Sequence, residues 1–288
     1  MGDMKLSIIT INYNNAEGLR KTMESVFSQT CREFEYIIVD GASSDGSVDV
    51  IRASALQAES LTFTWNSEPD HGIYEAMNKG LKIAQGEYVL MLNSGDYLVD
   101  ERVIERIMPE LHTEDMIQGN LIEDLPDKRI RNRGYGRSDI SFLDALGGYF
   151  LHQAMFIKLN TMKQYGYYDE SYKKNADTYF FIQALAFGNA TFRYVDIDIA
   201  NFDMHGITHS KDPKWDQIAK QENARWYGEH ISNRMMVLFR TAPNKIETYD
   251  ILRKHRFIWN IAMLLVRISE WLSPVVPQIK KEEIKSKS

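Results

Sequence analysis

The chain has one cysteine, Cys31, among its 288 residues. A single cysteine excludes an intramolecular disulfide framework and any metal site built from paired cysteines. A secretory signal is also missing, because Met1 to Lys5 lead directly into a predicted strand. We therefore expect a cytoplasmic protein, and leave open a peripheral association with the inner face of the membrane.

The sequence has no excess of positive charge and no apolar run long enough to span a bilayer. Its 34 Lys and Arg against 40 Asp and Glu give a net charge of −6, so nucleic acid is not an expected partner. The most apolar C-terminal stretch is interrupted by Arg267 before it reaches the about 20 residues of a transmembrane helix. The composition is that of an ordinary globular protein.

Apolar β-branched segments alternate with amphipathic ones over the first 115 residues. The pattern predicts strands at 6–11, 36–39, 61–65 and 88–92. Between them it predicts a helical segment with Leu19, Met23, Val26 and Phe27 on one face, a helix from 47 to about 58 and a helix at 73–85. Gly86 is the expected end of the last of these helices. Alternation of this kind predicts parallel strands in a Rossmann-like half, although the GxGxxG of dinucleotide sites is absent.

Three acids follow predicted strands of this half, namely Asp40, Asp70 and Asp96. Any one of them could be a turn residue or a helix cap. Together, at the carboxyl ends of parallel strands, they predict one cleft rimmed with acceptors. Such a cleft is suited to a nucleobase or ribose and to a divalent cation.

The second half, residues 116–212, has a looser pattern. It predicts strands at about 116–122, 154–157 and 192–199 and an apolar helix at 177–188. The side chains of Arg129, Arg131 and Arg133 alternate, which favours a solvated strand edge over a phosphate site.

Residues 213–288 are predicted to form a helical extension. Its segment 252–288 has eight Lys or Arg against three Glu and an apolar helical face flanked by Trp259 and Trp271. A basic amphipathic helix with tryptophans suits an anionic membrane surface, but it equally suits packing on protein. Both interpretations stay open.

Four segments resemble glycosyltransferase family two: Ser7–Asn14, Ile38–Ser47, Asp70–Gly80 and Leu92–Asp96. Their order and spacing fit as well, and the likeness is dense over residues 5–100, thinner to about 210 and absent beyond. The resemblance implies an α/β, GT-A fold. Its Rossmann-like, mostly parallel nucleotide-sugar half would span 1–115, its mixed acceptor-side half 116–212 and its C-terminal helical extension 213–288.

The resemblance also implies the donor site. Asp40 would accept hydrogen bonds from a nucleobase, usually uracil, with Asn12 and Asn14 in the same pocket. Asp70 would face the nucleotide near the ribose. Other residues of the matching motifs complete the predicted donor site: Thr10, Ser44, Gly72, Asn78, Asn93 and Ser94.

The family's metal motif is Asp-X-Asp, from which this chain departs. The segment Asn93-Ser94-Gly95-Asp96 keeps the last acid and has Asn93 where the first acid is usual. The resemblance implies Mn²⁺ or Mg²⁺ at Asp96, with His205 as a further ligand because some relatives place a histidine there. Since the site lacks one formal charge, the phosphates of the donor are expected to supply most of the ligands.

Residues Tyr168–Tyr179 resemble the family's stretch that ends in the catalytic acid at the start of a helix. Asp177 is therefore the predicted base, although an Asp in this position is otherwise most often a helix cap. His152 and Gln153 resemble a pair that holds the acceptor or the donor sugar in related members.

These residues predict an inverting glycosyltransferase that moves a hexosyl or N-acetylhexosaminyl group from a nucleotide diphosphate, UDP being expected, to a saccharide or lipid-linked acceptor. Enzymes of this type commonly build surface polysaccharide. Two alternatives stay open. A nucleotidyltransferase should carry a Gly-rich basic loop where Asn12 to Asn15 stand, and a catalytically weak nucleotide-sugar-binding protein would suit the altered metal motif.

Overall fold

The computed structural model describes residues 4–55, 58, 61–125, 128–203, 212–230 and 281–284. The chain divides into two compact units, one of residues 1–211 with 279–288 and the other of residues 212–278. Within the second unit, the helix α8 (Pro213–His230) buries Trp226, whose ring stacks on His230 with centroids 4.6 Å apart.

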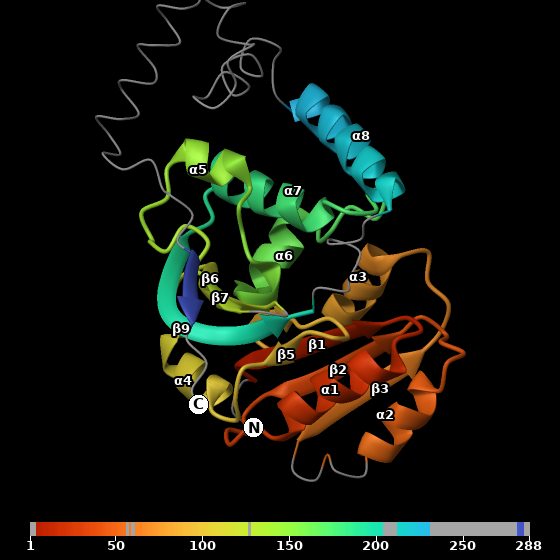
Figure 1. Cartoon of the computed structure of the whole chain (residues 1–288). Coiled ribbons are helices and arrows are strands. Elements are labelled where there is room, and N and C mark those ends of the chain that lie inside the picture. The colour runs from red at the N-terminus through yellow and green to blue at the C-terminus, as the bar shows by residue number, and fades with distance from the viewer. Residues whose placement is uncertain are drawn as a thin grey trace, which may run out of the picture. The chain divides into compact units, whose positions relative to one another are not determined.

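Strands and helices alternate through the first half of the chain, as predicted (Figure 1). β-branched and aromatic residues form the strands because their side chains pack well on a pleated surface. The elements follow in the order β1 (Leu6–Asn12), α1 (Ala16–Phe27), β2 (Glu35–Asp40), α2 (Ser47–Ala55), β3 (Thr62–Ser67), α3 (Ile73–Ile83) and β4 (Tyr88–Met91).

The four strands of this half are parallel and lie in the order β3-β2-β1-β4. Their carboxyl ends are in register, since Asn12 pairs with Asp40 and Asp40 with Ser67 across three neighbouring strands. Residues in one row of a sheet present their side chains on the same face. The register therefore brings three polar side chains together at one edge of the sheet.

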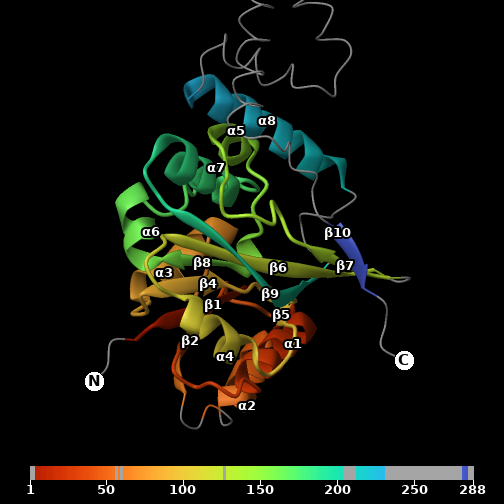
Figure 2. The same cartoon turned by 90° about the vertical axis from the view of Figure 1, so that its left-hand side faces the viewer.

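The second half adds antiparallel strands to the same sheet. From β4 outward the strands follow in the order β8 (Met155–Lys158), β6 (Met116–Asp124), β7 (Arg129–Asn132) and β10 (Lys281–Ile284) (Figure 2). The strand β9 (Phe192–Phe202) pairs parallel with β6 and antiparallel with β5 (Tyr97–Leu98). The remaining elements connect or cover these strands: α4 (Val103–Ile107), η1 (Met108–Glu110), α5 (Phe142–Gly147), η2 (His152–Ala154), α6 (Leu159–Tyr165), α7 (Ala176–Ile182) and the π-helical turn η3 (Gln183–Phe187). The mixed half was predicted, but not its pairing.

Helices cover both faces of the parallel strands. Leu19, Met23 and Val26 of α1 are fully buried in a core with one face of β1, β2 and β4. On the opposite face α3 approaches so closely that a side chain added at Gly80 would collide with Ile9. This two-sided burial explains why the strands have apolar residues at successive positions.

Three predictions differ from the structure. The helix α3 ends at Ile83, before the predicted end at Gly86, because Ala84 is already extended. Gly86 has another role, since a side chain there would collide with the backbone of Ser7. The arginines near β7 do not form a solvated edge, since Arg131 and Arg133 pair with Asp198 and Asp196 of β9 at 2.7 and 3.1 Å.

The predicted helical extension also contains a strand. Residues Lys281–Ile284 form β10, which pairs with β7, because a β-edge accepts any extended segment in register. The rest of the predicted amphipathic helix at 252–288 lies outside the described residues. Among the described helices none is long and apolar enough to cross a bilayer.

Candidate functional site

Asp40 is the centre of the polar row at the carboxyl ends of β1, β2 and β3. Its side chain is fully buried and accepts hydrogen bonds from Asn12 Nδ2 at 2.7 Å, Ser43 Oγ at 2.6 Å, the Ser43 backbone N–H at 2.9 Å and Ser67 Oγ at 2.7 Å. Burial alone would raise the pKa of Asp40, but these hydrogen bonds outweigh it and hold the pKa below its usual value. Asp40 is therefore a fixed anion.

The loop after β1 lies beside this row. Asn14 has a φ of 48°, and it receives the Ser44 backbone N–H on Oδ1 at 2.8 Å, which ties the loop after β1 to the loop after β2. A side chain added at Gly41 would meet both the Asp70 carboxylate and the Tyr13 ring, so both lie over this glycine.

Tyr13 is a site residue that sequence reasoning missed. Its side chain is 67% exposed, which makes it the most exposed large hydrophobic side chain among the described residues. An exposed ring next to a buried anion is a suitable stacking surface for a flat ligand. The signal was present, because Tyr13 stands inside a motif that carried the resemblance.

Two residues of the predicted donor site have internal contacts instead. Thr10 is fully buried and donates from Oγ1 to the Leu92 carbonyl at 2.7 Å. Asn78 is 4% exposed, donates to the Tyr168 carbonyl and to Glu170 Oε1 at 2.8 Å each, and accepts the Tyr168 N–H at 3.1 Å. Both side chains lie behind the site and hold its frame.

The turn after β4 carries the predicted metal ligand Asp96. This carboxylate is 3% exposed and accepts the Asp203 backbone N–H on Oδ1 at 2.8 Å. Burial raises the pKa of Asp96 to about 7, and the nearby Asp203 charge adds to the increase. Ser94 is anchored by hydrogen bonds in both directions with Asn15, at 3.2 Å each.

Asp203 is a second acid that the sequence did not single out. Its carboxylate lies against Gly95, whose φ of 106° and lack of a side chain allow this approach. Asp203 directly follows β9, as Asp40 ends β2. The predicted strand ends at about 199, so the rule that selected the first three acids does not reach it. His205 lies outside the described residues.

The donor set at Asp96 fits a hard divalent cation. The two neighbouring carboxylates of Asp96 and Asp203 offer oxygen atoms, which Mn²⁺ and Mg²⁺ prefer. A cation would also favour the ionised form of Asp96 that burial opposes. The described part of the chain holds no group of three or more His, Cys, Asp or Glu arranged for a metal, so the described residues by themselves offer an incomplete ligand set.

Asp177 lies in the first turn of α7, where two side chains reach it. Tyr74 Oη of α3 donates to Oδ1 at 2.8 Å, and His152 Nδ1 of η2 lies 3.1 Å from Oδ2. The other ring nitrogen of His152 lies 3.4 Å from Asn93 Nδ2, and Gln153 bonds to Asp96. The predicted base Asp177, the predicted acceptor residues His152 and Gln153 and the predicted donor residue Asn93 thus belong to one group that is linked by side-chain contacts.

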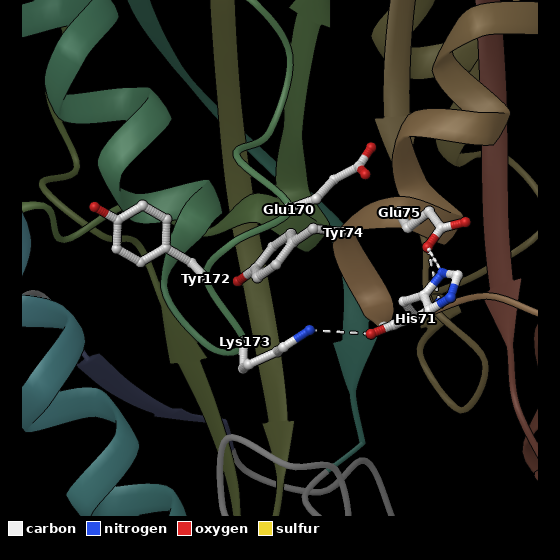
Figure 3. Close-up of a pocket in the computed structure, with 7 residues that line it drawn as sticks. His71, Tyr74, Glu75, Glu170, Tyr172 and Lys173 are labelled. Atoms are coloured by element: carbon white, nitrogen blue, oxygen red, sulfur yellow. Dashed lines mark hydrogen bonds and ion pairs between the residues drawn. The ribbon is translucent and has the colours of Figure 1, made fainter.

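A pocket of about 210 Å³ opens next to this group (Figure 3). Tyr74 forms part of its wall, so the pocket and Asp177 share one side chain. Lys173 Nζ donates to the His71 carbonyl at 3.0 Å and closes one side. The lining residues are His71, Gly72, Tyr74, Glu75, Glu170, Tyr172 and Lys173.

Comparisons with known proteins agree with the geometry. The family model "Glycosyl transferase family 2" matches residues 7–187. A "PGL/p-HBAD biosynthesis glycosyltransferase" of Mycobacterium tuberculosis is 28% identical over 206 residues, which cover 69% of this chain and 77% of the relative.

Two solved structures have the same fold. The S. aureus TarS fragment 1-349 in complex with UDP-GlcNAc matches with a TM-score of 0.59 and 17% identity, covering 81% of this chain and 78% of that one. The mannosyltransferase PcManGT from Pyrobaculum calidifontis in complex with GDP-Man and Mn²⁺ matches with a TM-score of 0.55 and 15% identity, covering 88% and 80%.

Proposed function

The chain belongs to glycosyl transferase family 2, and from this premise we propose that it transfers a hexosyl or N-acetylhexosaminyl group from a UDP-sugar to a saccharide or lipid-linked acceptor with inversion. The observation that carries the proposal is the grouping of three carboxylates with separate partners. Asp40 lies in the polar row, Asp96 follows β4, and Asp177 is connected through His152 to the turn that contains Asp96.

The polar row would bind the nucleoside. Asp40 is held as an anion and suits the ring N–H of uracil, while the exposed Tyr13 ring would stack on the base. Asp70, which lies over Gly41, would face the ribose, and the loops that contain Gly72, Ser44 and Asn14 would surround it. We give Thr10 and Asn78 positioning roles in place of donor contacts.

The turn Asn93–Asp96 would lie at the diphosphate. Asp96 and Asp203 are the described residues that would hold Mn²⁺ or Mg²⁺, and His205 remains a further proposed ligand. A bound cation would neutralise the charge that builds on the leaving diphosphate. Ser94, anchored by Asn15, keeps this turn in place.

Asp177 would act as the base. Its carboxylate would take the proton of the acceptor hydroxyl as that oxygen bonds to the anomeric carbon, while the bond to the diphosphate oxygen breaks and UDP leaves with the electron pair. The pocket beside Tyr74 is the proposed entry of the acceptor. Gln153, which bonds to Asp96, stays a proposed contact of the acceptor. A lipid-linked acceptor would agree with the basic C-terminal segment.

The test begins with binding. Thermal shift with UDP-glucose, UDP-GlcNAc and GDP-mannose, each with and without Mn²⁺, should show stabilisation by UDP-sugars that Mn²⁺ increases, because a ligand that binds only the folded state stabilises it. Stabilisation by GDP-mannose alone would contradict the UDP assignment.

Turnover then tests the base. Asp177→Asn should lower the release of UDP by roughly 100-fold or more while UDP affinity in calorimetry stays near wild type. Asp49→Asn is the matched control, since the Asp49 side chain is 83% exposed on α2. Retained turnover in Asp177→Asn would show that Asp177 is not the base. Release of pyrophosphate from UTP in the presence of a sugar 1-phosphate would favour a nucleotidyltransferase.

A further inference from the structure

Both oxygens of the Asp177 carboxylate are occupied by side chains from distant parts of the chain. Tyr74 bonds to Oδ1 from the first turn of α3, and His152 lies on Oδ2 from η2, before β8. The side chains of His152 and Asp177 are only 18% and 16% exposed. The carboxylate is therefore held from two sides in a largely buried place.

The direction of each hydrogen bond follows from the chemistry. An ionised carboxylate only accepts, so Tyr74 must donate its hydroxyl hydrogen and His152 must carry a hydrogen on Nδ1. The second ring nitrogen, Nε2, then lies 3.4 Å from Nδ2 of the Asn93 amide. A neutral imidazole accepts the amide hydrogen there, whereas an imidazolium needs the amide turned so that Asn93 Oδ1, which is buried without a hydrogen-bond partner among the described residues, accepts from Nε2–H. The imidazole therefore connects Asp177 to the turn of Asp96.

Three titratable groups face Asp177 from the elements packed on it, namely Tyr74 of α3, His152 of η2 and Tyr168 of the preceding loop. Burial would raise the pKa of Asp177, but the His152 and Tyr74 contacts and the Thr178 backbone N–H hold it below its usual value. Burial would lower the pKa of His152, but Asp177 and the more distant Asp96 raise it above the value of free histidine. Among the described residues, His152 is the only cationic side chain paired with Asp177.

We propose that Tyr74 and His152 clamp the Asp177 carboxylate in the orientation needed for proton transfer, and that His152 couples this clamp to Asn93 at the diphosphate end of the donor. The inference rests on the proposed role of Asp177 as the base. Each carboxylate oxygen has two lone pairs: the clamp uses one on each, the Thr178 backbone N–H takes a third, and the one left is the position that would take the proton. Tyr74 and His152 are positioning residues, since neither takes the proton.

The clamp also gives a reason for Asn93. A carboxylate at this position would be a second anion on the same imidazole and would favour the tautomer with its hydrogen on Nε2, which removes the hydrogen from Nδ1 that Asp177 accepts. With a neutral amide at position 93, Asp177 is the only one of the two side chains beside the imidazole that carries a negative charge. The departure from Asp-X-Asp is therefore consistent with the needs of the base.

Histidine NMR tests the clamp without any substrate. The His152 ring, assigned by its loss in His152→Gln, should titrate above the roughly 6.5 of free histidine. In Asp177→Asn its pKa should fall by about one unit or more, as expected when an adjacent opposite charge is removed. A His152 ring that titrates like free histidine and does not respond to Asp177→Asn would overturn the clamp, whether or not sugar transfer is found.

Kinetics test the positioning role. With the best donor from the thermal-shift panel, Tyr74→Phe and His152→Gln should lower kcat roughly 10- to 100-fold, the loss expected from a misplaced group, with KM for the donor unchanged. The acid limb of the kcat profile should move to higher pH in both variants, and further in His152→Gln, because losing these contacts raises the pKa of Asp177.

Two substitutions serve as controls. Tyr194→Phe removes another tyrosine hydroxyl bonded to a side chain, Asn120 Oδ1, at 2.7 Å, and His112→Gln removes an exposed histidine. Both should keep the wild-type acid limb. An unmoved acid limb in Tyr74→Phe and His152→Gln would overturn the positioning role. If the wild type transfers no sugar but the His152 titration still depends on Asp177, the proposed function is rejected and the hydrogen-bonded clamp is retained.

Discussion

Replacing Asp96 by Asn should stabilise the protein in the absence of a cation and abolish its response to one. The Asp96 carboxyl is 3% exposed and its pKa is raised from 3.8 to about 7. Because the folded pKa lies above the unfolded one, folding favours the protonated form. The resulting penalty is absent below about pH 3.8, grows between the two pKa values and is complete above about pH 7, where three pKa units correspond to about 4 kcal/mol.

The neutral amide introduced by Asp96→Asn carries no such penalty and can still accept the Asp203 N–H. In chemical denaturation with a chelator, the variant should therefore exceed wild type by up to about 4 kcal/mol at pH 8 and by about 2 kcal/mol at pH 5. Adding Mn²⁺ to the UDP-bound protein should then increase the stability of wild type and leave that of the variant unchanged.

Asp100→Asn is the matched control. Burial would raise the pKa of Asp100, but hydrogen bonds and the Arg106 charge outweigh it and hold the pKa below its usual value. Its removal should therefore not stabilise the protein at pH 8. Ionised Asp96 carries no burial penalty if Asp96→Asn is less stable than wild type at pH 8 in the chelator, or if its advantage does not shrink at pH 5.

Two further substitutions test other parts of the site. Tyr13→Ala should raise the Kd for UDP by about 10-fold, which is in the lower range of base–aromatic stacking. It should not change Tm, because the ring is 67% exposed. Calorimetry with Tyr13→Phe as control checks this, and an unchanged Kd contradicts it. Gly95→Ala should lower the free energy of unfolding more than Gly46→Ala does. Both glycines have positive φ, but only a side chain at Gly95 would collide with a neighbour, Asp203. Equal losses would contradict the close approach of Asp203 to Gly95.

The parallel half of the fold could be predicted because its signals are local. The β-branched runs at β1, β2 and β4 and the amphipathic helices between them carry their own periodicity. The pairing of β8 with both β4 and β6 could not be predicted, because it joins segments far apart in sequence. The arginines near β7 were misjudged for the same reason, since their partners belong to β9.

The site divides in a similar way. Asp40, Asp96 and Asp177 are visible as acids next to element ends, and the motifs around them carry the family. Tyr74 was not singled out, because its contact with Asp177 spans 103 residues. The contact between His152 and Asp177 likewise depends on how η2 and α7 pack, which a single sequence does not encode in any short pattern.

The saturated carboxylate of Asp40 has a consequence for nucleotide recognition. Four donors already bond to its two oxygens, and a carboxylate offers about four such positions. A nucleobase N–H that reaches Asp40 must therefore displace a donor, and the hydroxyls of Ser43 and Ser67 are the two that can rotate away. Base recognition is then an exchange of one hydrogen bond for another, so its enthalpy is expected to be small, and affinity for the base must come mainly from stacking and shape.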